Sequence, residues 1–206
     1  MVRTLIAINL IVYALQGMDP VYWISHFALW PVGSGPIETG AGWAMAPEFR
    51  PWQLVSYGFL HGNLSHLALN LFALWMFGST VERFWGTARF TVYYLVCLIG
   101  AALIQMMAMA MHLQGGGQPF PTLGASGAVF GLLLAFGMMF PNQRILLLFP
   151  PIPIKAKWLV IGYGALELFF GLAGIATNIA HFAHLGGMLF GFLLIQFWRS
   201  NAVYRG

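Results

Sequence analysis

The sequence predicts an all-α membrane protein, a bundle of six transmembrane helices formed by a single domain over residues 1–206. Two observations lead to this fold class: 60% of the 206 residues are hydrophobic and only 7% are charged. A soluble domain carries about 25% charged residues, because polar groups must solvate its surface. The composition therefore excludes a soluble globular domain, and it excludes a disordered chain, which would be polar.

Six apolar segments account for the predicted helices. A span takes about 20 apolar residues, and the segments lie near 4–17, 62–83, 88–112, 125–140, 157–173 and 178–199. The first begins like a signal peptide but has no obvious small-residue cleavage site, so we expect it to be retained. Asn9 and Gln16 interrupt this helix, and a turn signal at Pro141 ends the fourth. A long outer loop, about 18–61, is rich in Pro, Gly and Trp, and its aromatic stretch 21–30 suits the membrane interface.

The basic residues predict the orientation of the chain. With the N-terminus inside, eight of the nine basic residues lie on the cytoplasmic side and only Arg50 lies outside, as the positive-inside rule favours. We therefore expect both termini in the cytoplasm. The net charge of +4 is small and is sorted to one side of the membrane, which argues against a nucleic-acid-binding protein. The single cysteine, Cys97, excludes an intrachain disulfide and a Cys-rich metal site.

A few polar residues remain in or beside the predicted spans, where they are costly and therefore candidates for function. They are His61, His66, Asn70, Ser126, Glu167, Asn178, His181 and His184. The second, fourth and sixth helices all descend from the outer face, and each carries such a group near its start. On this arrangement Ser126 lies roughly 8–10 Å below the outer boundary of the bilayer. Groups that are distant in the chain thus share one depth, as the parts of an outward-opening site would.

A serine and a histidine at one depth predict nucleophilic catalysis. A serine hydroxyl is a weak nucleophile until a base, usually histidine, takes its proton. Ser126 stands at a helix start, near backbone N–H groups that can stabilise an oxyanion. His66 and Asn70 are four residues apart, so they share a helix face and can supply further donors. Each of these residues alone is more commonly a packing residue or an interhelical contact, but their joint occurrence favours a site with His184 as the base.

Glycines indicate how the fourth and sixth helices meet. The pairs Gly127 with Gly131 and Gly187 with Gly191 are each four residues apart, a spacing that lets backbones approach closely in membranes. His184 shares a face with the second pair. If these faces dock, His184 approaches Ser126, and Phe130 packs one turn below, beneath the imidazole.

A catalytic triad would need a carboxylate on the histidine. The single aspartate, Asp19, lies in the outer loop, and Glu167 is the only glutamate deep in a span. We therefore favour a Ser126–His184 dyad and interpret Glu167 as a neutral or hydrogen-bonded contact between helices. No metal or haem site is expected from the histidines, because the sequence has no H-E-x-x-H arrangement. A transporter is not favoured, because no inverted repeat is evident, and no cofactor is expected.

Three motifs together resemble those of the rhomboid intramembrane serine proteases. The family patterns H-x4-H-x3-N, G-x-S-G and A-H-x-x-G-x3-G match residues 61–70, 124–127 and 183–191, in order and on the expected helices. Segments 52–56, 59–61 and 82–86 are similar to the family as well. The resemblance covers nearly the whole chain and implies the minimal six-helix form, without an added soluble domain.

The resemblance implies a role for each matched residue. It makes Ser126 the nucleophile and His184 the general base, and it places His66, Asn70 and the Ser126 N–H around the oxyanion. The other matched residues have supporting roles: close packing for Gly124, Gly127, Gly187 and Gly191, and support of the outer loop and of water access for His61. Phe130 stands where some members have tyrosine, and His181 falls at a position that varies between members.

The resemblance also implies the substrates and the setting. Substrates would be single-span membrane proteins that enter sideways from the lipid bilayer, near the second and fifth helices, and are cut close to the outer face. The expected location is the inner (plasma) membrane of a bacterium, with the site facing outward. The alternative function is a non-catalytic rhomboid-like module that binds or escorts membrane helices, and a structural scaffold is a weaker third interpretation.

Overall fold

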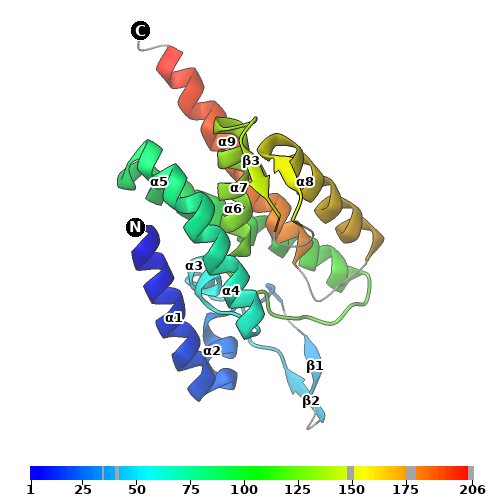
Figure 1. Ribbon diagram of the computed structural model, residues 1–206. Coiled ribbons are helices and arrows are strands. Elements are labelled where there is room, and N and C mark those ends of the chain that lie inside the picture. The colour runs from blue at the N-terminus through cyan, green and yellow to red at the C-terminus, as the bar shows by residue number, and fades with distance from the viewer. Residues whose placement is uncertain (34, 40–41, 148–150, 175–179, 204–206) are drawn as a thin grey trace.

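The computed structural model describes residues 1–33, 35–39, 42–147, 151–174 and 180–203, which form a bundle of helices with two small β-hairpins (Figure 1). Helices occupy the described parts of the six predicted segments to within a few residues at their ends; residues 178 and 179, at the start of the sixth, lie outside the described residues. The longest are α1 (Val2–Met18), α6 (Thr87–Gln114), α7 (Ser126–Met139), α8 (Ala156–Ala173) and α9 (His181–Val203). In the second predicted segment, α4 (Leu64–Ala73) continues through the π-helical turn η2 (Leu74–Gly78) into α5 (Ser79–Trp85).

The helices have the length and composition of membrane spans. Among the described residues, four stretches are long and apolar enough to cross a bilayer: Leu64–Trp85, Thr87–Gln114, Ala156–Ala173 and His181–Ser200. Helices α1 and α7 are apolar but shorter. Many large apolar side chains point outward, with Leu172 73% exposed and Met107 64% exposed. Such a surface is suited to lipid rather than to water, so the chain is a multi-pass membrane protein.

The outer loop between α1 and α4 contains regular structure that the sequence analysis did not predict. It holds α2 (Pro20–Phe27), the hairpin β1 (Pro36–Thr39) with β2 (Gly42–Met45), α3 (Gln53–Ser56) and the 3₁₀ turn η1 (Tyr57–Phe59). The side chain of Asp19 caps α2 by accepting the N–H of Tyr22 at 3.0 Å. The loop is folded around Gln53, whose fully buried Oε1 accepts the N–H groups of Trp30 and Arg50, each at 3.2 Å.

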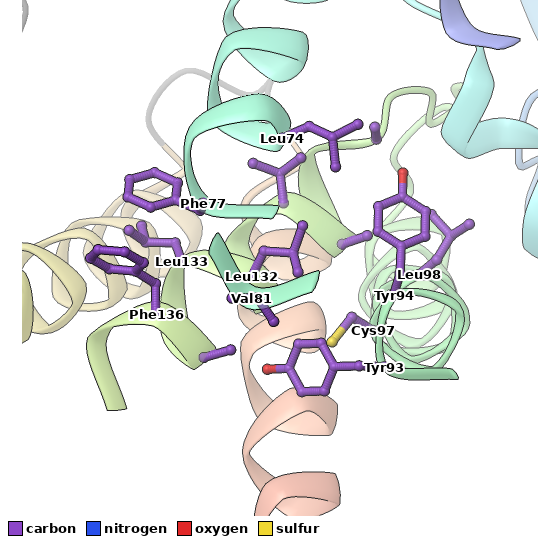
Figure 2. Close-up of a cluster of buried hydrophobic side chains, with 14 of the residues drawn as sticks. Leu74, Phe77, Val81, Tyr93, Tyr94, Cys97, Leu98, Leu132, Leu133 and Phe136 are labelled. Atoms are coloured by element: carbon purple, nitrogen blue, oxygen red, sulfur yellow. The ribbon is translucent and has the colours of Figure 1, made fainter. Parts of the chain in front are cut away.

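The apolar core lies where η2 and α5 face α6 and α7 (Figure 2). Phe77 meets Phe136 edge to face, with ring centroids 5.2 Å apart. On the other side of α7, the Tyr93 hydroxyl of α6 donates to the carbonyl of Gly131 at 2.8 Å. This bond satisfies the buried hydroxyl and ties α6 to the helix that carries Ser126.

A second hairpin separates α7 from α8, where the sequence analysis predicted only a turn. Its strands, β3 (Arg144–Leu146) and β4 (Pro153–Lys155), pair antiparallel with Ile145 opposite Ile154. Ile145 is buried against the core. In Figure 1 this hairpin and the end of α9 lie toward one end of the bundle, and the β1–β2 hairpin lies at the other.

Candidate active site

Ser126 is the first residue of α7, and the turn before it is built by glycine. Gly124 has φ +123°, a backbone conformation that side chains disfavour. A Cβ at this position would also lie 2.7 Å from Cε1 of His66. The N–H of Gly124 donates to the carbonyl of Tyr57 at 2.9 Å, which anchors the turn to η1. The turn leaves Ser126 at a helix N-terminus, where the first backbone N–H groups have no partner within the helix.

His184 of α9 faces Ser126 directly. Its Nε2 lies 2.8 Å from Ser126 Oγ, which is hydrogen-bonding distance. The imidazole stacks on the ring of Phe130, with centroids 4.2 Å apart and planes 4° from parallel. His184 is only 8% exposed. The Ser126 hydroxyl is thus paired with a histidine nitrogen that can accept its proton. The stacking on Phe130 leaves the imidazole little freedom to tilt.

Close contact between α7 and α9 makes this pairing possible. A Cβ on Gly187 would overlap the backbone carbonyl of Gly127, and a Cβ on Gly131 would lie 3.1 Å from the carbonyl oxygen of Gly187. A Cβ on Gly191 would lie 3.0 Å from the sulfur of Cys97. The structure thus places Gly127, Gly131 and Gly187 at the contact between α7 and α9, where they set the distance between the two helices, whereas Gly191 packs against Cys97 of α6.

His66 and Asn70 of α4 lie beside Ser126. A Cβ added at Gly124 would lie 2.9 Å from Nε2 of His66 and 3.7 Å from Ser126 Oγ, so ring and hydroxyl flank the same backbone position. Asn70 donates one amide hydrogen to the carbonyl of His66 at 2.9 Å. An amide nitrogen carries two hydrogens, so the second is available for a bond inside the site.

An apolar cavity of about 390 Å³ opens at Ser126. It runs between α4, η2, α7 and α8, and the β3 hairpin contributes to its wall. Its lining includes Asn70, Ser126, Phe130, Ile145 and Tyr163. Tyr163 meets Phe130 edge to face at 5.9 Å. The sequence analysis did not single out Tyr163, because an aromatic residue in an apolar span carries no signal of its own.

His61 lies outside the cavity lining and is fully buried. Its ring is 5.1 Å from that of His66, and neither ring nitrogen has a hydrogen-bond partner among the described residues. Burial, and secondarily the neighbouring His66, lowers the pKa of His61 to about 4. Its backbone is held by Gln16, which accepts the N–H of His61 at 3.1 Å and donates to its carbonyl at 2.9 Å. Gln16, one of the two polar residues in the first predicted helix, therefore joins α1 to the segment before α4.

Glu167 lies close to His184 as well as to His181, whereas the sequence led us to interpret it only as a contact between helices. Its Oε2 lies 2.6 Å from Nδ1 of His181 and 3.0 Å from Nδ1 of His184. The first contact is the interhelical bond that we expected. The second puts a carboxylate on the far side of the imidazole from Ser126, although the Nδ1 of His184 lacks the alignment of a hydrogen bond. The sequence could not reveal this, because it does not specify how α8 is rotated about its axis.

The three groups form a compact cluster. One side-chain nitrogen or oxygen atom from each of Glu167, His181 and His184 lies within 4.8 Å of the other two, a spacing that could also hold a metal ion such as zinc. In the structure Glu167 and His181 are joined by a direct hydrogen bond between their side chains. Asn178, the remaining polar candidate, lies outside the described residues.

Comparison with known proteins gives one consistent family. The Rhomboid domain family model matches residues 48–200. "Rhomboid protein 1, mitochondrial" of Saccharomyces cerevisiae is 30% identical over 208 residues, covering 94% of this chain and 54% of the yeast protein. "Rhomboid protease GluP" of Bacillus subtilis is 34% identical over 141 residues, covering 68% of this chain and 25% of that protein. "Rhomboid protease GlpG" of Yersinia enterocolitica is 27% identical over 172 residues, covering 82% and 56% of the two chains. The chain thus spans about half or less of the length of these curated relatives.

Proposed function

Since this chain belongs to the rhomboid family, we propose that it is an intramembrane serine endopeptidase. In this proposal it hydrolyses peptide bonds in or near the transmembrane segments of single-span membrane proteins. The observation that carries the proposal is the 2.8 Å contact between Ser126 Oγ and His184 Nε2, beside an apolar cavity that Ser126 lines. Relatives that are named rhomboid proteases support the same reaction class.

The proposed reaction begins when Ser126 Oγ attacks the scissile carbonyl carbon while His184 Nε2 takes the hydroxyl proton. The negative charge moves to the carbonyl oxygen. In this proposal three hydrogen-bond donors stabilise that oxyanion: the Ser126 N–H, the second amide hydrogen of Asn70, and His66. When the C–N bond breaks, the imidazolium returns its proton to the leaving amine. Water, activated by the same histidine, then hydrolyses the ester on Ser126 and regenerates the hydroxyl.

The cavity suggests how substrate reaches Ser126. It lies between α4 and α8, the second and fifth predicted spans, and its lining is mostly apolar. A substrate helix that enters sideways from lipid would keep its apolar side chains in apolar surroundings. Its scissile carbonyl is hidden in an i to i−4 hydrogen bond, so the segment must unwind near its end. We therefore propose cleavage beside helix-weakening residues, after a small side chain.

The proposed orientation places both termini in the cytoplasm and the active site toward the outer face of a bacterial plasma membrane. The distribution of charge supports it. Arg83, Arg144, Lys155 and Arg199 belong to α5, β3, β4 and α9. The β3–β4 hairpin and the end of α9 lie toward the end of the bundle opposite β1–β2 (Figure 1). Basic residues gathered at one end would face the cytoplasm.

Labelling with a fluorophosphonate probe tests the proposal. The purified protein in detergent should be labelled at Ser126, and it should cleave a transmembrane substrate in proteoliposomes. Ser126→Ala and His184→Ala should each abolish both signals while keeping the thermal unfolding profile. The double variant should be no worse than either single variant, because the two residues act as a unit. A folded wild type that binds transmembrane segments without labelling or cleavage would instead identify the non-catalytic binding or escort module.

A further inference from the structure

Glu167 connects two histidines of α9 through one oxygen atom. Oε2 lies 2.6 Å from Nδ1 of His181 and 3.0 Å from Nδ1 of His184. All three groups are shielded: counting side-chain atoms alone, 12% of Glu167, 6% of His181 and 10% of His184 is exposed. A carboxylate with so little exposure is costly unless it is paired or hydrogen-bonded. Here its neighbours are two imidazoles one helical turn apart.

We propose that Glu167 is a positioning residue for catalysis, which holds His184 in the tautomer and orientation that activate Ser126. The inference rests on the proposed function. For Nε2 to accept the Ser126 proton, it must present a lone pair, so the imidazole hydrogen must reside on Nδ1. A carboxylate at Nδ1 favours that tautomer and stabilises the imidazolium that forms when the proton arrives. In this proposal three side chains act in series: Ser126, His184 and Glu167.

The surrounding contacts have separate effects. His181 bonds the same oxygen at 2.6 Å and ties α8 to α9. Phe130 stacks on one face of the His184 ring, with ring centroids 4.2 Å apart. This stacking helps to keep the ring edge-on to Ser126 and Glu167. The contact between Glu167 and His184 is not aligned as a hydrogen bond in the free protein. Catalytic hydrogen bonds are commonly long or poorly aligned without substrate and tighten when substrate binds.

The competing explanation is that Glu167 only clasps α8 to α9 through His181. The two explanations differ in what each variant does. Glu167→Gln keeps the shape of the side chain but removes its charge, so it affects both histidines. His181→Leu removes the clasp and leaves the contact between Glu167 and His184 in place. Glu167→Asp keeps the charge on a shorter side chain and serves as the conservative variant.

The experiment compares kcat, KM, the rate of fluorophosphonate labelling and the melting temperature of these variants in one detergent. We expect Glu167→Gln to lower kcat and the labelling rate at least about tenfold, with KM within about twofold of the wild type. Glu167→Asp should recover part of kcat. His181→Leu should lower the melting temperature while kcat falls less than about threefold. If Glu167→Gln proves unstable, Glu167→Asp and His181→Leu still separate the two explanations, because Glu167→Asp should lower kcat more than His181→Leu does, whatever their melting temperatures.

Three results would overturn the inference. Wild-type kcat in a folded Glu167→Gln variant would show that the charge is not needed. Equal losses of kcat in Glu167→Gln and His181→Leu, in proportion to their losses of melting temperature, would show that Glu167 only ties α8 to α9. Loss of wild-type activity in EDTA, with recovery in Zn²⁺, would make the cluster a metal site. A wild type that is neither labelled nor active would reject the proposed function itself, and so it is distinguishable from these results.

Discussion

Adding one methyl group at Gly187 should disable the site without touching a catalytic residue. The Cβ of Gly187→Ala would overlap the backbone carbonyl of Gly127 and lie 3.3 Å from its Cα. Backbone atoms cannot move aside as a side chain can, so α7 and α9 must separate by on the order of 1 Å to reach ordinary contact. Ser126 is next to Gly127, and His184 is one turn before Gly187, so the separation acts on their 2.8 Å contact.

The expected magnitude follows from that displacement. A misplacement of about 1 Å at a catalytic centre can cost about 10²-fold in rate, and overpacking costs about 1–3 kcal/mol of stability. We therefore expect Gly187→Ala to lower kcat/KM by about two orders of magnitude and to lower the melting temperature. Cleavage of a transmembrane substrate in proteoliposomes, together with thermal unfolding in detergent, measures both effects.

Gly162→Ala in α8 is the matched control. A Cβ at Gly162 meets no atom within 4 Å, so this variant should keep wild-type activity and stability. Wild-type kcat/KM in a folded Gly187→Ala variant would refute the reasoning, because it would mean that the distance between α7 and α9 does not control the contact between Ser126 and His184.

Four further predictions follow from the same structure. Asn70→Ala should lower kcat more than it changes KM, by less than the roughly 10²–10³-fold known for a lost oxyanion donor, since the Ser126 N–H remains; a change in KM alone, measured by steady-state cleavage, would show that Asn70 positions substrate instead. Gln53→Leu should destabilise the outer loop by about 1–3 kcal/mol, because two backbone N–H groups lose their acceptor; an unchanged melting temperature would contradict this. The pKa of His61, lowered to about 4 by burial, means that the unfolded chain binds the proton first. The free energy of unfolding should thus fall by up to about 1.4 kcal/mol per unit as the pH drops from about 6.5 toward 4, and His61→Phe should flatten this dependence in pH-resolved unfolding. Replacing Gly or Pro near the outer end of a substrate span with Leu should slow its cleavage with little change in binding, and equally fast cleavage of an all-Leu span would argue against unwinding.

The sequence was sufficient to predict the long apolar helices. An apolar span must satisfy its backbone hydrogen bonds internally, so a run of about 20 apolar residues becomes helical wherever it packs. The segment predicted at 88–112 is α6 at Thr87–Gln114, and the one predicted at 157–173 is α8 at Ala156–Ala173. The outer loop was harder, because its helices and hairpin are short and are held by bonds such as those to Gln53, which join residues far apart in the chain.

The candidate site was predictable in part, for a related reason. Ser126, His184 and the glycines beside them carry local signals: a helix start, a four-residue spacing and a shared face. The structure brings these residues together at the distances that such packing allows. Their roles in catalysis remain proposals.

What the sequence alone determined is therefore which long segments are helices and which polar residues lie near the starts of those helices, because both follow from spacing along the chain and from the cost of polar groups in lipid. The tertiary structure alone decided how each helix is rotated. Rotation of α8 turns Glu167 toward both histidines of α9, and packing of α1 turns Gln16 onto the backbone of His61. A helix that is apolar on nearly all sides has no periodic signal for its buried face, so only contact with its neighbours specifies where a polar side chain such as Glu167 points.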